Sequence, residues 1–148
     1  MKKILVICSV FVFCLVSVVK SDAQSRKAVS GAEVTGTFRE KSSGSEFKIS
    51  ALGRGKLRVA FSGVYAYKMA NGEDMANTGE ASGKADISGD TATFKPTDFE
   101  EQCTITLKFL TRGRLKVTQA GTDAGCGFGF NVSADGDYKK ISGKKPKF

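Results

Sequence analysis

Short runs of alternating apolar and polar residues follow one another along most of the chain. The longest extends from Leu57 to Tyr67, with Val59, Phe61 and Tyr65 among the residues at every second position. A period of two turns one set of side chains inward and the other toward water, which is typical of a β-strand. The pattern recurs, most weakly in the third segment, over residues 34–39, 47–51, 79–89, 91–95, 103–109, 115–118, 126–132 and 136–141.

These runs predict an all-β domain. Glycine-rich or polar turns separate them, and no stretch after residue 23 keeps a helical period over about three turns. Many short strands form either a sandwich or a small closed barrel. We favour an antiparallel β-barrel of about eight strands, because closure removes exposed strand edges. Gly36 and Gly63 suit the sharp bends of such a barrel.

The N-terminus has a different pattern. A basic start at residues 1–3 precedes an apolar run at 4–19, and Ser21 and Ala23 are small residues before a plausible cleavage point. This order predicts a secretory signal peptide at 1–23, and the run is shorter than the roughly 20 residues of a membrane span. The predicted plan is a signal peptide at 1–23, a polar lead at 24–32, a β-barrel at 33–142 and a lysine-rich tail at 143–148.

Signal cleavage would remove two of the four cysteines, Cys8 and Cys14. Cys103 and Cys126 would then form a disulfide in an oxidising compartment. In a simple up-and-down barrel, strands starting at these cysteines would be next-but-one neighbours, about 10 Å apart. A disulfide needs Cα atoms within about 7 Å of each other. Either Cys126 therefore lies in a bent turn or the strand order is not a simple meander.

Charge indicates a preference for anionic surfaces. Cleavage removes three lysines and one aspartate, so the formal charge of +8 falls by two and stays positive. A charge that serves only solubility is the simpler interpretation. Aromatic residues are not interleaved with the basic ones, so no nucleic acid is expected as a partner. The candidate contacts with an anionic partner are Lys139, Lys140, Lys144, Lys145 and Lys147, although such a lysine-rich end is also typical of a frayed terminus.

The chain contains no histidine, which excludes Ser-His-Asp and Cys-His catalysis and removes the commonest zinc ligand. We therefore predict a protein that is not an enzyme, with no catalytic residues, no metal site and no cofactor. Two acidic groups, Glu73 with Asp74 and the segment from Asp98 to Glu101, offer the alternative of a hydrolase or weak calcium site, and Asp135 with Asp137 is a more remote calcium candidate in a predicted turn. Solvated loops explain both groups more simply.

Five aromatic residues are candidates to face a ligand. They are Phe61, Tyr65, Tyr67, Phe109 and Phe128. All lie on the apolar phase of their runs, so they form either a packed core cluster or the lining of a ligand cavity.

The last third of the chain resembles a small exported β-domain of bacterial envelope proteins, including the C-terminal parts of lysozyme-inhibitor-like proteins. The similarity lies in the segments 103–109, 115–121 and 126–139, above all in the Cys-Gly-Phe-Gly-Phe stretch that starts at Cys126. It implies an envelope protein and a small disulfide-bonded barrel of the calycin or lysozyme-inhibitor type.

Membrane-bound inhibitors of c-type lysozyme offer a second comparison. Their inhibitory loop carries Ser-Gly followed two residues later by Tyr, whereas here Tyr65 comes one position early after Ser62 and Gly63. Strand alternation would turn that ring to the other face. A net positive charge would also repel a basic lysozyme.

We therefore expect an exported, non-enzymatic binding protein of the bacterial envelope, in the periplasm or outside the cell, that could resemble an inhibitor of a foreign hydrolase. Its partner would be a protein or an anionic envelope component. The alternative is a carrier of a small apolar or amphipathic ligand inside the barrel.

Overall fold

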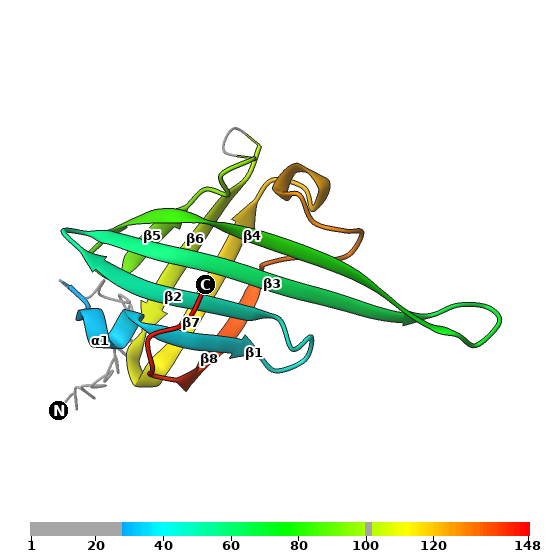
Figure 1. The fold of residues 1–148 in the computed structure, drawn as a ribbon, viewed down its shortest axis with the longest axis horizontal. Helices are drawn as coiled ribbons and strands as arrows, with labels where there is room; N and C mark the ends of the chain where they lie inside the picture. The colour runs from blue at the N-terminus through cyan, green and yellow to red at the C-terminus, as the bar shows by residue number, and fades with distance from the viewer. Residues whose placement is uncertain (1–27, 100–101) are drawn as a thin grey trace, which may run out of the picture.

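The chain folds into a closed β-barrel. A computed structural model describes residues 28–99 and 102–148 (Figure 1). Within these residues, eight strands pair in chain order, each antiparallel to its neighbours, and β1 closes the barrel on β8. The predicted all-β antiparallel barrel is confirmed. The strands are β1 (Gly36–Glu40), β2 (Glu46–Gly53), β3 (Lys56–Lys68), β4 (Asp74–Ser88), β5 (Thr91–Phe94), β6 (Thr104–Leu110), β7 (Arg114–Ala120) and β8 (Gly136–Ser142).

The predicted signal peptide at residues 1–23 lies outside the described residues, as does the first part of the polar lead. The described part of the lead ends in a short helix, α1 (Gly31–Val34). Ser30 caps it, and Val34 is buried against the core. Four residues are too few for a helical period to be visible in the sequence. In the described part of the chain, no helix is long and apolar enough to cross a membrane.

Aromatic rings fill the barrel interior. Phe47 lies with its ring centroid 4.9 Å from that of Phe61 and 5.1 Å from that of Tyr138. Phe61 in turn lies 5.0 Å from Phe128, while the ring of Phe38 packs edge-on against that of Phe109 with centroids 6.0 Å apart. These side chains are almost fully buried. Burial raises the pKa of Tyr138 above its usual range, and its hydroxyl donates a hydrogen bond to the carbonyl of Ala134.

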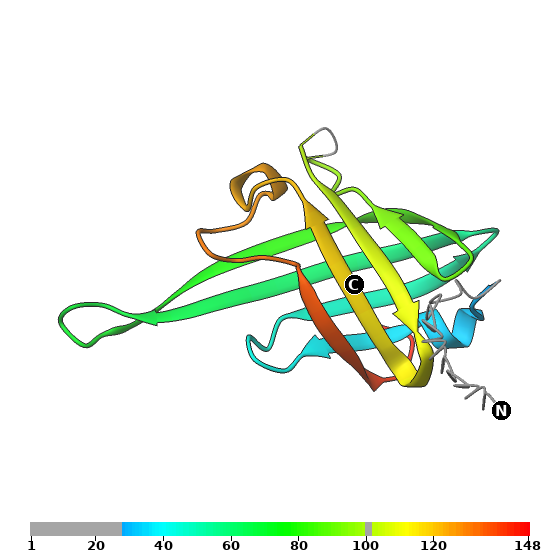
Figure 2. The ribbon, with the colours of Figure 1, turned by 180° about the vertical axis from the view of Figure 1, so that it is seen from behind.

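The prediction of a strand at 126–132 is wrong. After β7 the chain turns through a short 3-10 helix, η2 (Ala124–Cys126), and then crosses the barrel mouth as a loop before β8 (Figure 2). Residues 126–132 alternate in the sequence because this loop buries the side chains of Phe128 and Val132 and leaves Phe130 77% exposed. Gly127 adopts a left-handed backbone conformation with φ of 76°, which ends the turn rather than extending a strand.

This loop also explains the disulfide. Cys103 immediately precedes β6 and Cys126 lies in η2, and their Cα atoms are 4.8 Å apart. The strand order remains a simple meander, so the bent-turn alternative is the one that the structure shows. The disulfide ties the mouth-crossing loop to the start of β6.

Candidate functional site: a two-stranded arm at the mouth of the barrel

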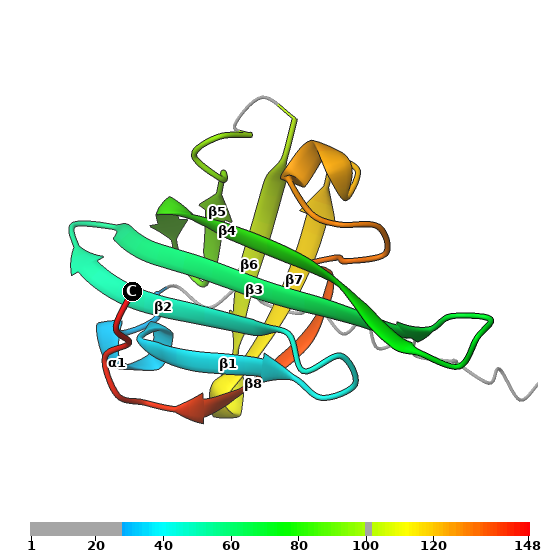
Figure 3. The same ribbon diagram turned by 45° about the vertical axis from the view of Figure 1, so that its right-hand side comes forward.

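The hairpin of β3 and β4 is much longer than the barrel is tall. Its strands have 13 and 15 residues, and the pairing continues from the barrel wall out to Lys68 opposite Asp74. The pairing of β2 with β3 stops at Ser62, so beyond that point β3 has left the wall. Residues 64–78, which we call the arm, project away from the barrel as a two-stranded ribbon (Figures 1 and 3).

One face of the arm carries large apolar side chains in solvent. Tyr65 is 39% exposed and Tyr67 is 36% exposed, and their rings stack with centroids 6.1 Å apart. Met75 is directly opposite Tyr67 and therefore shares its face, and Met69 follows at the tip. Both methionines are 45% exposed. The alternation that buries Phe61 in the barrel thus continues outward into water.

The five predicted ligand-facing residues divide into two groups. Phe61, Phe109 and Phe128 are buried in the core, at most 5% exposed. Tyr65 and Tyr67 have the same alternation as Phe61, as predicted, but lie beyond the barrel and do not line its interior. The rings are therefore not brought together around one cavity.

The mouth-crossing loop braces the base of the arm. Gly63 and Gly79 face each other where the arm leaves the barrel, and a Cβ at Gly79 would lie 2.8 Å from the Phe128 ring. The missing side chain lets the loop pack directly on the ribbon. Two hydrogen bonds hold it there: Gly129 N–H donates to the carbonyl of Thr78 at 3.0 Å, and the Asn77 side-chain amide donates to the carbonyl of Phe130 at 2.8 Å.

Two acidic residues, Glu40 and Asp135, lie beside the arm base. Glu40, at the end of β1, accepts hydrogen bonds from the backbone and side chain of both Ser42 and Ser43. The Ser43 N–H and the Ser42 hydroxyl contribute most to lowering the pKa of Glu40 to about 2. Glu40 and Asp135 line a groove of about 290 Å³ beside Tyr65. Because its pKa is lowered to about 2, the Glu40 carboxylate stays charged at any physiological pH.

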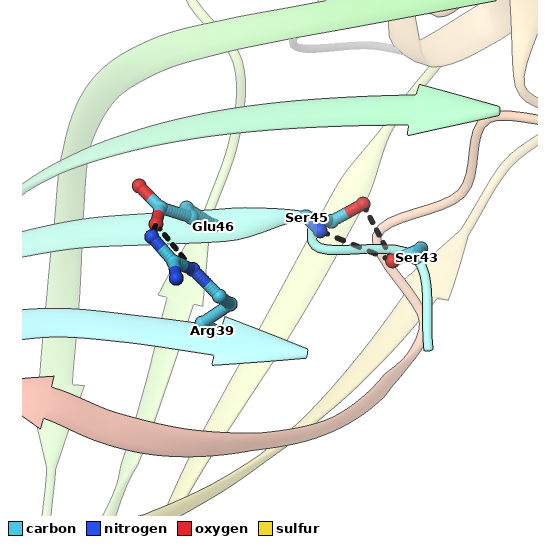
Figure 4. A network of polar contacts seen from close by, with 4 residues as sticks. All are labelled: Arg39, Ser43, Ser45 and Glu46. Atoms are coloured by element: carbon cyan, nitrogen blue, oxygen red, sulfur yellow. Dashed lines mark hydrogen bonds and ion pairs between the residues drawn. The ribbon is translucent and has the colours of Figure 1, made fainter. Parts of the chain in front are cut away.

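The turn between β1 and β2 is held rigid beside this groove. Ser43 and Ser45 share hydrogen bonds within the turn, and Ser45 is buried. Arg39 donates to Glu46 across the two strands at 2.6 Å (Figure 4). The positive charge of Arg39 is thus matched locally, and the turn presents Glu40 in one fixed geometry.

The five lysines proposed to contact an anionic partner do not form a single cluster. Lys140 makes hydrogen bonds within the protein: its ammonium group donates to the carbonyls of Ala32 and Glu33, at 2.7 and 2.9 Å. Burial lowers the pKa of this lysine, partly offset by the charge of Glu33. Lys139 lies exposed on β8, and the remaining three, Lys144, Lys145 and Lys147, lie on the exposed tail.

The acidic segments considered for hydrolysis do not converge either. Glu73 lies in the turn at the tip of the arm, whereas Asp74 pairs with Lys68 at 2.6 Å. Asp98 lies on the loop after β5, and Glu100 and Glu101 are outside the described residues. Across residues 28–99 and 102–148, no group of three or more histidine, cysteine or acidic side chains could hold a metal ion.

No protein-family model matches the chain, and no curated protein or solved structure matches it significantly. Sequence reasoning missed Met69, Met75 and Phe130 as surface residues of the arm and its base. The only available signal was the length of the run from Leu57 to Tyr67, which exceeds the usual length of a strand.

Proposed function

We propose that this protein is an exported, non-enzymatic binding protein that holds a partner protein through the arm. The observation that carries the proposal is the row of exposed Tyr65, Tyr67 and Met75 on a projecting ribbon. A two-stranded hairpin is only marginally stable alone in water, and exposed apolar patches mark interaction sites. Tyrosine rings and flexible methionines are well suited to contact a protein surface.

The partner that suits this element is a protein with a cleft and a cationic rim. A narrow ribbon with apolar side chains fits a concave site, and Glu40 and Asp135 at the arm base would meet the rim. Hydrolases carry their active sites in clefts of this kind. Inhibition of a foreign hydrolase, one of the forms of binding expected from the sequence, is therefore the form of binding that we favour.

Export is part of the proposal and has its own support. The order of basic, apolar and small residues at 1–23 is that of a signal peptide, and the disulfide Cys103–Cys126 is stable in oxidising compartments. Intact mass measurement of the protein from its producing cells should give a chain that begins at Gln24. A chain that retains residues 1–23 would contradict export with cleavage.

Affinity capture with three baits tests the binding function. The wild type is compared with Tyr65→Ser/Tyr67→Ser/Met75→Ser and with the control Ile141→Ser, which removes an apolar side chain of 51% exposure on β8. We expect the wild type and the control to recover the same envelope protein, and the arm variant to lose it by about tenfold or more. Equal recovery by all three baits, or by none, would contradict the proposal.

A further inference from the structure

The outer surface of the barrel carries a second candidate site, distinct from the arm. A groove of about 1000 Å³ runs over β3, β4 and β5, on the side of the sheet away from the core. Three of its lining residues, Arg58, Lys84 and Lys95, are cationic. Hydroxyl groups accompany them, from Ser82, Thr93 and Thr97.

The three cations form a row across neighbouring strands. Arg58 is directly opposite Lys84 in the β3–β4 register. Lys95 follows β5 at the position that continues the pairing of Ala85 with Phe94, so it faces Lys84 from the other side. Neighbouring strands are about 4.8 Å apart, and like charges placed opposite each other destabilise a sheet. The fold therefore holds three positive charges in a line at an electrostatic cost.

Nearby acidic groups do not neutralise this row. Asp86, the acidic residue of the groove lining, forms an ion pair with Lys56. Within residues 28–99 and 102–148, none of the three cations of the row pairs with a carboxylate. An anionic ligand lying along the row would relieve the repulsion between the three cations.

Two further side chains adjoin the row. Ser50 is opposite Arg58 on β2, is 2% exposed, and its hydroxyl has no hydrogen-bond partner in the described part of the chain. The ring of Phe148 lies over the Arg58 guanidinium at 4.5 Å and forms one wall of the groove. The site thus combines charge, hydroxyl groups and an aromatic face, which together suit a carbohydrate better than a simple ion.

We propose that this groove binds an acidic oligosaccharide, a short chain of uronic acid sugars. Its carboxylates would lie on Arg58, Lys84 and Lys95 in charge-assisted hydrogen bonds. Successive sugars in such a chain advance by about one strand spacing. Their carboxylates point to different sides of the chain, so the long, flexible Lys84 and Lys95 side chains would reach those that do not face the sheet. The hydroxyls of Ser82 and Thr93 would meet the sugar hydroxyls on the two sides of the row. The Thr97 hydroxyl donates to the carbonyl of Ser82 at 3.0 Å, so it would accept a hydrogen bond from the sugar. This inference is independent of the arm.

Calorimetric titration with trigalacturonate, and with maltotriose as the neutral sugar of equal length, tests the inference. We expect saturable binding of trigalacturonate only, which weakens as salt is added. Lys84→Gln/Lys95→Gln should weaken binding by about tenfold or more. The matched control is Lys108→Gln/Lys116→Gln, which also removes two lysines opposite each other, but in a row where Asp137 supplies a counter-charge. It should bind as the wild type does.

Three results would overturn the inference. The first is the absence of saturable binding of trigalacturonate. The second is an equal loss in the control variant, which would show attraction by overall charge. The third is tighter binding of tripolyphosphate than of trigalacturonate, which would show that the row recognises concentrated phosphate charge and not an acidic sugar chain.

Discussion

Glu40 shows how one side chain organises the acidic surface at the arm base. Four hydrogen bonds from Ser42 and Ser43 converge on a single carboxylate oxygen, at 2.6 to 3.0 Å. Hydrogen bonds to the charged form of an acid favour that form, and they hold the pKa of Glu40 near 2, below its ordinary value of 4.5. The carboxylate thus stabilises the turn between β1 and β2 while carrying a permanent charge beside Tyr65.

This arrangement predicts a pH-dependent contribution to stability. Because the pKa of Glu40 is lower in the folded chain, its stabilisation is full above about pH 4.5 and is lost as the pH falls toward 2. Glu40→Gln should therefore reduce the free energy of unfolding by about 1 kcal/mol at pH 7, after discount for solvent screening, and by much less at pH 2. Urea unfolding at both pH values measures the difference.

Glu80→Gln is the control for this prediction, since Glu80 is an exposed glutamate on β4. It should leave stability nearly unchanged at both pH values. A Glu40 variant as stable as the wild type at pH 7, or one whose loss persists undiminished at pH 2, would contradict the role given to this carboxylate.

At the scale of elements, the arm depends on the loop that crosses the barrel mouth. Phe128 lies on Gly79, and its ring extends to Phe61 inside the barrel. The disulfide fixes the start of the loop at Cys126, and Tyr138 bonds its other end through Ala134. The arm is therefore anchored to the core through a brace that sequence-distant segments build together.

Gly79→Ala tests this brace. The added Cβ would lie 2.8 Å from the Phe128 ring, so the ring must move, and we expect a loss of about 1–3 kcal/mol in the free energy of unfolding. Amide exchange should also increase in the loop and at the arm base. Gly143→Ala is the control, because nothing lies within 4 Å of a Cβ at that position. Equal stability of the two variants would show that the loop does not pack on the arm as described.

Alternation predicted most of the strands because each strand buries one face, and a buried face requires an apolar residue at every second position. The prediction failed at 126–132 because Phe128 and Val132 belong to a loop that buries their side chains, and such a loop gives the same alternating sequence as a strand. It also could not show that Tyr65 and Tyr67 lie in solvent, since alternation gives the face but not the point where a strand leaves the barrel. The pairing of Tyr67 with Met75 depends on the register of the β3–β4 hairpin, which could not be predicted from the weak alternation at 79–89.

At the scale of the whole molecule, charge is distributed unevenly. The strand ends and loops at the arm end of the barrel carry Glu40, Glu46, Asp98, Asp123, Asp135 and Asp137 beside the basic Lys41. The arm adds Glu73, together with Asp74 and the Lys68 that pairs with it. The turns at the opposite end carry Arg54, Arg112 and the buried Asp90, and the lysine-rich tail leaves from that end. Screening limits electrostatic interactions to about 8 Å at physiological salt. A partner at the arm therefore meets local acidic groups, and net positive charge is no argument against a basic partner.

In the proposed function, the arm is the surface that holds a partner protein. Photo-crosslinking in the producing cells tests this, with a photoreactive amino acid at position 67 on the arm or at position 141 on β8. The proposed function predicts a discrete protein adduct from position 67 that position 141 does not give. The same adducts from both positions, or none from position 67, would contradict it.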